Sequence, residues 1–474
     1  MPISQLMILP FLSLMRTELI VTGFLLLFFV LYLFQFKSNR ALLSFLHIMW
    51  LLVLVTAFIR PDTGTLFVDT FETNGLISFQ KTFLFIFFGI ILCFNADWLL
   101  QHKNLYEFII LMLAALLGIC MLLSSKHFLL LYLSLELTAI PIATLCVLEL
   151  RKRVASEAGI KMIFSSAFAS GILLFGISLM YGLSGSLYFD DLSVLKLNSS
   201  LHALAFILIF AAFAFKLSLV PFHLWTADVY QGSPITTTAF LSVVSKTGSV
   251  FILLAILYKV FPNFEPLWYN LIVFVSVATI LIGNLFAIRQ TNVKRFLAFS
   301  SIAQMGYIIA GMSAFSNEGA SAVIYFVTIY GFSNLIVFGV FALVSQLTGK
   351  EDLGEYRGFY QENKLLSWSL AIGLISLAGI PPTAGFFGKF LLMTAAASKI
   401  NIYFVIFLGL NLMISLYYYM RIVRSMFESS DMPLQSVLLN FPARVGIYLC
   451  IACILLLGFI GWFYDHIQQL VMLN

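Results

Sequence analysis

Residues 201–221 of the chain read LHALAFILIFAAFAFKLSLVP. Thirteen consecutive apolar residues precede Lys216, and the mainly apolar run continues to Val220. The length of this run is close to the roughly 20 residues that a bilayer crossing needs. Pro221 then removes a backbone donor and clashes with the preceding turn, so the helix must bend or end there. Carbonyls freed at membrane depth persist only beside protein or a wet cavity. The stretch therefore predicts a broken membrane helix with a polar interior nearby.

The composition of the whole chain supports this interpretation. Hydrophobic residues make up 61% of its 474 residues and charged residues 10%, with a mean hydropathy of +1.03. An ordinary soluble domain is about 25% charged, so a water-soluble fold is excluded. We predict an all-α integral membrane protein with about 14 transmembrane helices, near 17–36, 41–59, 76–96, 105–123, 126–148, 159–181, 201–220, 235–258, 267–288, 296–314, 320–346, 366–395, 400–420 and 443–463.

The loop charges orient these helices. Sixteen lysines and arginines fall in odd-numbered connections, whereas seven lie in the even-numbered connections and the N-terminal segment, namely Arg16, Arg60, Lys81, Lys126, Lys196, Lys259 and Lys399. Cytoplasmic loops carry the excess of cations, so both termini are expected on the non-cytoplasmic side. Three of the 26 cations remain, Lys216, Lys246 and Lys389, and all three fall inside predicted helices.

A second break lies in the predicted twelfth helix, where residues 379–389 read GIPPTAGFFGK. Proline and glycine are common in membrane helices, but here too a lysine accompanies the break. The breaks in helices 7 and 12 are five helices apart, and an odd spacing inverts a repeated unit, as in many transporters. The predicted division is 1–104 for helices 1–3, 105–260 for the first five-helix repeat, 261–425 for the inverted second repeat and 426–474 for helix 14.

The ionisable residues at bilayer depth are the candidate site. Glu136 lies near the centre of the fifth helix and Lys246 near that of the eighth, and Lys216 and Lys389 complete the row. A charge at such depth costs roughly 2.5–3.5 kcal/mol and usually faces an interior or a water path. A buried lysine can release its proton and an arginine cannot, so the row predicts proton transfer. The alternatives are buried ion pairs that fix packing and, for Lys216 and Lys389, snorkelling.

Four further residues could support the row. Glu157 and Lys161 are spaced to pair on one helix face. His223 and Asp228 follow the first break, in a predicted cytoplasmic loop. There they could form a proton entrance or cap a helix. No dinucleotide fingerprint, iron–sulfur cysteine spacing or haem motif is present, so no cofactor is expected in this chain. The cysteines lie in apolar runs and are expected to pack in the core: Cys93, Cys120, Cys146, Cys450 and Cys453.

Four stretches carry a family resemblance: residues 215–234 (FKLSLVPFHLWTADVYQGSP), 290–295 (QTNVKR), 379–389, and 416–421 (LYYYMR). With them the chain resembles the antiporter-like, proton-translocating membrane subunits of respiratory complex I, NADH:quinone oxidoreductase, most closely the subunit N branch. The resemblance covers nearly the whole chain.

The resemblance implies a proton path in which Glu136 modulates Lys216, Lys246 is the central relay and Lys389 is the exit-side group. Gln304 stands where the family often has histidine, and a glutamine cannot titrate. The implied partners are a neighbouring antiporter-like subunit, small membrane subunits and lipid, without nucleic acid. NADH, FMN, iron–sulfur clusters and quinone are expected in partner subunits. The expected location is a bacterial inner (plasma) membrane rather than an organellar one.

Other functions would suit the same helices and lysines. The chain could instead be a subunit of a multisubunit cation/proton antiporter or of a membrane-bound hydrogenase. It could also be a structural anchor whose buried charges only lock helices together.

Overall fold

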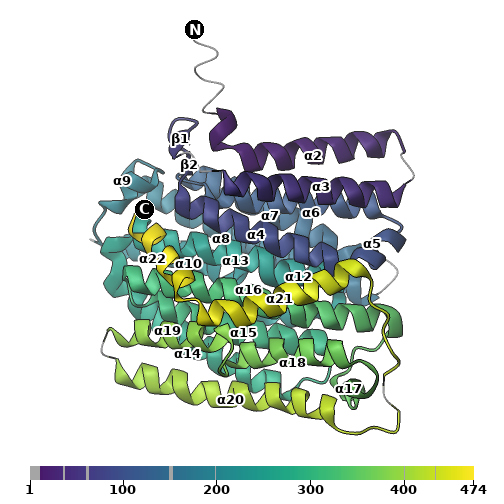
Figure 1. Cartoon of the computed structure of the whole chain (residues 1–474). Coiled ribbons are helices and arrows are strands. Elements are labelled where there is room, and N and C mark those ends of the chain that lie inside the picture. The colour runs from purple at the N-terminus through teal and green to yellow at the C-terminus, as the bar shows by residue number, and fades with distance from the viewer. Residues whose placement is uncertain are drawn as a thin grey trace.

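A computed structural model gives the fold, and it describes residues 11–35, 38–59, 63–148, 153–197, 199–399, 401–432 and 434–473. The chain is a bundle of long helices that run side by side (Figure 1). The predicted all-α membrane fold is therefore confirmed. Four cations that entered the loop-charge count lie outside the described residues: Lys37, Arg60, Arg151 and Lys152.

Helices occupy all fourteen predicted crossings. Among the described residues, eleven helices are long and apolar enough to span a membrane. Three further apolar helices, α10, α18 and α19, are shorter because two crossings are broken. The unbroken helices that follow the predicted runs are α2 (Arg16–Leu33), α3 (Asn39–Phe58), α4 (Gly75–Phe94), α6 (Leu105–Leu123), α7 (Phe128–Val147), α8 (Arg153–Ser184), α14 (Glu265–Arg289), α15 (Val293–Met312), α16 (Asn317–Thr348) and α20 (Ile402–Phe427).

The two predicted breaks are confirmed. Helix α10 (Ser200–Lys216) ends at its lysine and α11 (Leu224–Gly232) resumes the crossing, so the predicted loop with His223 and Asp228 is largely a helix instead. The backbone N of Val220, within this break, donates to Thr279 Oγ1 of α14 at 3.0 Å. The second break separates α18 (Lys364–Ala378) from α19 (Ala384–Ala397). Each break thus exposes helix ends inside the bundle.

The eighth and fourteenth crossings differ from the prediction of regular helices. The eighth consists of α12 (Ile235–Phe240), the π-helical η1 (Leu241–Ser245), α13 (Lys246–Ala255) and the π-helical η2 (Ile256–Val260). Lys246 therefore follows a π turn, a distortion that is frequent at functional sites. The fourteenth breaks at Ile460 into α21 (Phe441–Phe459) and α22 (Gly461–Met472).

Short elements that the apolar runs do not predict connect the crossings. Strands β1 and β2 form an antiparallel hairpin at the end of the bundle where α9 and the C-terminus lie (Figure 1). The bounds of the short elements are β1 (Gly64–Leu66), β2 (Phe71–Thr73), α5 (Ala96–Gln101), α9 (Phe189–Ser193), η3 (Pro262–Phe264), η4 (Leu353–Tyr356) and α17 (Phe359–Glu362).

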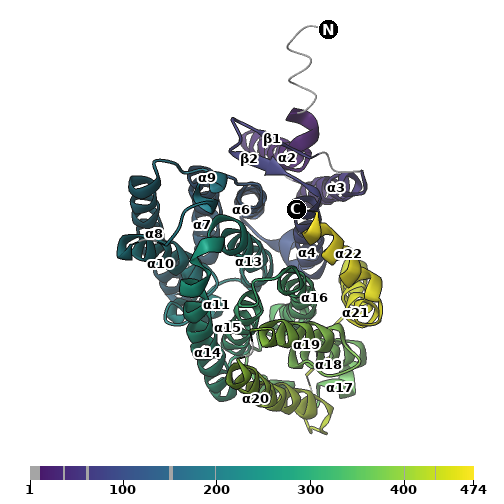
Figure 2. The ribbon, with the colours of Figure 1, turned by 90° about the vertical axis from the view of Figure 1, so that its left-hand side faces the viewer.

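Helix α16 lies at the centre of the bundle. Viewed along the helices, α13 and α16 are surrounded by other helices, whereas α2 and α20 lie at the edges (Figure 2). The most apolar window of α16 is completely buried by protein, whereas that of α2 is only 17% buried. Helix α2 begins and α22 ends at the same end of the bundle (Figure 1), as an even number of crossings requires. The division into inverted repeats and the orientation toward the cytoplasm stay predictions.

A buried ion pair joins the first helices. Lys81 Nζ of α4 lies 2.6 Å from Glu18 Oε1 of α2 and donates to Ser124 Oγ at 2.6 Å, and both charged side chains are 3% exposed or less. Thr17 donates to the other Glu18 oxygen at 2.7 Å. Counting Lys81 with the loop cations is therefore wrong, because the residue lies inside α4, within the predicted helix 76–96, where its charge needs a partner.

We expect Glu18→Gln to destabilise the protein by roughly 3–5 kcal/mol, because it leaves the Lys81 charge buried without its partner. Thermal unfolding of the purified protein in detergent measures this loss. The matched control is Glu265→Gln at the exposed Glu265–Lys399 pair, where surface pairs contribute only about 0–1 kcal/mol. Equal losses in the two variants would contradict the expectation.

Candidate functional site

Lys216 and Glu136 line one small cavity. The cavity measures about 20 Å³ and is bordered by α7, α8 and the last turn of α10. Glu136 accepts a hydrogen bond from Ser170 Oγ of α8, whereas Lys216 Nζ is buried without a hydrogen-bond partner in the described part of the chain. A volume of this size holds about one water molecule. A single water can therefore connect the carboxylate and the ammonium group.

Lys246 lies in a polar contact chain within the central helices. Its side chain is 1% exposed, and Nζ donates to Ser301 Oγ of α15 at 2.9 Å. Ser301 in turn shares a hydrogen bond of 2.8 Å with the Tyr330 hydroxyl of α16. Nζ also lies 5.6 Å from the ring centroid of Tyr230. The contacts of Lys246 are thus hydroxyl groups and an aromatic face, with no carboxylate within ion-pair distance among the described residues.

Two buried hydroxyl groups near Lys246 add to its polar surroundings. The Tyr230 hydroxyl and Ser242 Oγ, on α11 and η1, are buried and interact with each other, and Tyr230 also interacts with Ser301. Buried hydroxyl groups can bind further partners, including water. This region is therefore polar enough to hold water beside Lys246.

Lys389 binds the end of the preceding half-helix. Its Nζ, on α19, donates to the carbonyl oxygens of Leu377 and Ala378 at 2.6 and 3.3 Å. These carbonyls form the last turn of α18, where the helix dipole attracts a cation. Lys216 likewise occupies the last turn of α10. Each break therefore places a lysine at the C-terminal end of a half-helix, in its last turn for Lys216 and against its last carbonyl groups for Lys389.

Helix α15 connects the surroundings of Lys246 and Lys389. Ser301 contacts Lys246, and one turn further along α15 Gln304 Nε2 donates to the Leu377 carbonyl at 3.0 Å, the same oxygen that Lys389 binds. Gln304 also donates to the Tyr419 hydroxyl at 3.2 Å. The amide thus hydrogen-bonds the group that Lys389 binds, lies one helical turn from the Lys246 contact on α15, and cannot carry a charge itself.

The supporting acidic and basic residues meet in a second cluster. Lys161 lies 2.7 Å from Glu157, as the i,i+4 spacing predicts, and 2.5 Å from Asp228 Oδ2. Asp228 Oδ1 binds Arg295 Nη1 of α15 at 2.7 Å. Asp228 is therefore an ion-pair partner rather than a helix cap. His223 occupies the N-cap position of α11 without a side-chain capping bond, and its Nδ1 is buried without a partner in the described chain.

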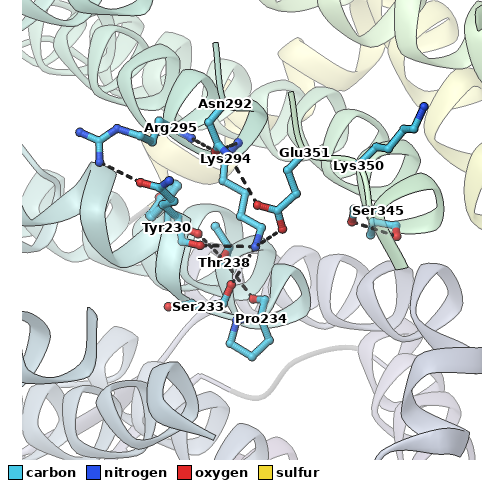
Figure 3. Close-up of polar contacts among 12 residues, drawn as sticks. Tyr230, Ser233, Pro234, Thr238, Asn292, Lys294, Arg295, Ser345, Lys350 and Glu351 are labelled. Carbon is cyan, nitrogen blue, oxygen red and sulfur yellow. Dashed lines mark hydrogen bonds and ion pairs between the residues drawn. The ribbon is translucent and has the colours of Figure 1, made fainter. Parts of the chain in front are cut away.

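Lys294 extends this cluster to the loop after α16. Its Nζ lies 2.8 Å from Glu351 Oε1 and 3.4 Å from the carbonyl oxygens of Gln231 and Ser233 (Figure 3). A cavity of about 610 Å³ lies beside these residues and is also lined by Arg153. The cavity offers charged groups an aqueous surface at the end of the bundle predicted to be cytoplasmic.

The polar groups around Lys246 and Gln304 could not be identified from the sequence alone. Ser301 contacts Lys246, Tyr330 contacts Ser301 and Tyr419 contacts Gln304, and these residues come from α15, α16 and α20, far apart in the sequence. One signal was available, because Ser300, Ser301 and Gln304 are polar residues in an apolar helix and share one face at helical spacing.

Another cavity, of about 310 Å³, lies at the opposite end of α13. On its rim Lys126 binds Asp190 at 2.9 Å, and this hydrogen bond raises the pKa of Lys126 above its ordinary value, against the opposing effect of burial. Across the described ranges, no group of three or more His, Cys, Asp or Glu residues could hold a metal ion.

Comparison with known proteins places the chain in a family. The family profile described as NADH:quinone oxidoreductase/Mrp antiporter, transmembrane, matches residues 125–415. The NADH-quinone oxidoreductase subunit N of Phocaeicola vulgatus is 41% identical over 467 residues, which are 97% of this chain and 98% of that protein. The chain belongs to the NADH-quinone oxidoreductase subunit N family. The family predicted from the sequence motifs is thus confirmed.

Solved structures share the fold of this subunit N family member. A chain of the respiratory complex I of Thermus thermophilus, solved with bound aureothin, is 27% identical, with a TM-score of 0.76 over 93% of this chain and 96% of that chain. A chain of the Mrp complex from Dietzia sp. DQ12-45-1b has a TM-score of 0.87 at 20% identity, over 96% of both chains. At that identity the Mrp likeness shows the fold alone.

Proposed function

We propose that this subunit N family member translocates protons through Glu136, Lys216, Lys246 and Lys389, driven by electron transfer in partner subunits. The observation that carries the proposal is a set of three lysines inside the bundle, of which Lys246 and Lys389 are buried and Lys216 has a buried Nζ. Each is surrounded by hydroxyl groups, carbonyl groups or a water-sized cavity. Burying a charge without an ionic partner is costly, so a purely structural role explains Lys246 and Lys389 poorly.

The first step involves Glu136 and Lys216. Their shared cavity accommodates one water, so the carboxylate acts on Lys216 across a short distance without a permanent ion pair. An opposite charge at about 4 Å contributes roughly 4 kcal/mol at an effective dielectric near 20. A change in the position or protonation of Glu136 is therefore strong enough to load or unload Lys216.

The second step joins Lys246 to Lys389. Lys246 exchanges a proton through Ser301 and water toward the α15 face, and Lys389 receives it at the end of α18. Gln304 holds the shared Leu377 carbonyl in place and contributes no titration. Water or the nearby hydroxyl groups must therefore carry the proton past Gln304.

The surroundings of the chain follow from this role. We propose a bacterial inner membrane with both termini on the non-cytoplasmic side, and a place in the complex beside another antiporter-like subunit and small membrane subunits. NADH, FMN, iron–sulfur clusters and quinone would belong to partners, so this chain would be the non-redox, proton-translocating part of the enzyme.

Lys246→Ala tests the proposal in vesicles that contain the assembled complex. NADH-driven proton uptake is expected to fall roughly 100-fold or to background, the size typical for removal of a proton-transfer group. Blue native electrophoresis checks that the complex assembles. Unchanged proton uptake in Lys246→Ala would refute the relay. Proton movement driven by a sodium gradient without NADH would instead indicate an antiporter.

A further inference from the structure

The conspicuous segment without a role so far is QTNVKR, residues 290–295, which leads into α15. Asn292 caps this helix, because its side chain accepts from the backbone N atoms of Lys294 and Arg295 at 3.0 and 3.2 Å. The cap fixes the first turn of α15. The backbone positions from which the side chains of Lys294 and Arg295 extend are therefore fixed.

Arg295 contacts α11 through side chains. Its Nη1 lies 2.7 Å from Asp228 Oδ1 and 3.0 Å from Gln231 Oε1. The second oxygen of Asp228 binds Lys161 of α8. One carboxylate on α11 is thus held between cations from two other helices, which makes a network rather than an isolated surface pair.

The side chain of Lys294 contacts backbone carbonyl groups of α11. Its Nζ lies 3.4 Å from the carbonyl oxygens of Gln231 and Ser233, at the C-terminal end of α11, where a cation is favoured by the helix dipole. Glu351 balances its charge at 2.8 Å (Figure 3). Lys294 is only 8% exposed, so solvent screens this contact weakly.

The two helices joined in this way both belong to the candidate proton path. Helix α11 continues the crossing that is broken after Lys216 and carries Tyr230, whose ring faces Lys246. Helix α15 carries Ser301, which binds Lys246 about 9 Å along the helix from Arg295, at 1.5 Å per residue. A shift of α11 relative to α15 therefore moves groups on two sides of Lys246.

We infer that Lys294 and Arg295 are positioning residues, which hold α11 against α15 so that the groups around Lys246 keep the alignment that proton transfer needs. The inference rests on the proposed function and adds a role for a motif outside the row of buried charges. Neither residue contacts the transferred proton, so both act through the helices that they join.

The test compares variants in vesicles that contain the complete complex, with proton uptake and quinone reduction measured separately. Arg295→Gln and Asp228→Asn are expected to lower protons pumped per NADH by about five-fold or more, equivalent to about 1 kcal/mol. The double variant is expected to be no worse than the poorer single variant, because the two residues share one interaction. Arg295→Lys is expected to recover at least half of the pumping, because it restores a cation opposite Asp228.

Arg289→Gln is the matched control, since Arg289 is an exposed arginine at the same end of the bundle with no ion pair in the described chain; it should pump normally. If Arg295→Gln does not assemble, Glu351→Gln carries the test and should lower pumping by a similar factor. Additive losses in the double variant, or normal pumping in Arg295→Gln, overturn the inference. Lys246→Ala is measured alongside: normal pumping there refutes the proposed function, whereas a loss there with normal pumping in Arg295→Gln refutes only the positioning role.

Discussion

Lys246→Arg is expected to stop NADH-driven proton pumping almost as completely as Lys246→Ala, although it keeps the positive charge. A guanidinium group can still donate to Ser301 and lie against the Tyr230 ring, so contacts that hold helices together would remain. It does not release a proton under physiological conditions, so a relay must fail. The expected loss is roughly 100-fold in the rate of proton uptake.

The effect of the larger size of arginine must be distinguished from the effect of its inability to release a proton. Lys246 is fully enclosed, and overpacking a core costs typically about 1–3 kcal/mol. The amount of assembled complex and its melting temperature therefore accompany each uptake measurement. Lys126→Arg serves as the control, because Lys126 forms a rim ion pair with Asp190 that an arginine can replace. If Lys246→Arg assembles and pumps at the normal rate, the three buried charges are structural anchors and the relay is refuted.

Gly385→Ala is expected to abolish stable assembly of the protein. A Cβ atom at position 385 would lie 1.9 Å from the backbone oxygen of Ser376, and a backbone atom cannot rotate away. Relief would require α19 to move away from α18 and would carry Lys389 off the carbonyl oxygens of Leu377 and Ala378. The expected destabilisation exceeds the roughly 1–3 kcal/mol of ordinary overpacking.

Protein yield in the membrane and the unfolding temperature in detergent measure this effect. Gly182→Ala is the matched control, because a Cβ atom at Gly182, inside α8, meets nothing within 4 Å. Alanine favours a helix by about 1 kcal/mol over glycine, so this control should be neutral or stabilising. Equal yields for both variants would show that the α18–α19 contact tolerates a side chain.

Much of the fold follows from the sequence because the bilayer fixes the length of each apolar run. The breaks after Lys216 and Ala378 were predictable as well, since proline marks both. The π turn of η1 was not, because Leu241–Ser245 contains no residue that marks such a turn. The separation of α21 from α22 escaped prediction because apolar residues continue across Ile460, and the flanking Gly458 and Gly461 are of a type common in unbroken membrane helices.

The site was less predictable than the fold. Subtracting loop cations isolates Lys216, Lys246 and Lys389, but it says nothing about which helices face them. Ser301 and Gln304 become meaningful only once α15 is known to pass both Lys246 and the α18 end. Lys81 shows the opposite failure: it lies near the end of an apolar run, where a loop residue and a buried one look alike until Glu18 is found beside it.

The enclosed position of α16 bears on how the protein responds to its membrane. With 32 residues, the helix is about 48 Å long, well beyond a hydrocarbon core of about 30 Å. Because its central window is covered by protein on every side, lipids do not touch it there. Changes in bilayer thickness therefore act first on peripheral helices such as α2, through tilt and local deformation. The hydroxyl of Tyr330, beside Lys246, is thus carried by a helix that is insulated from the lipid composition of its host.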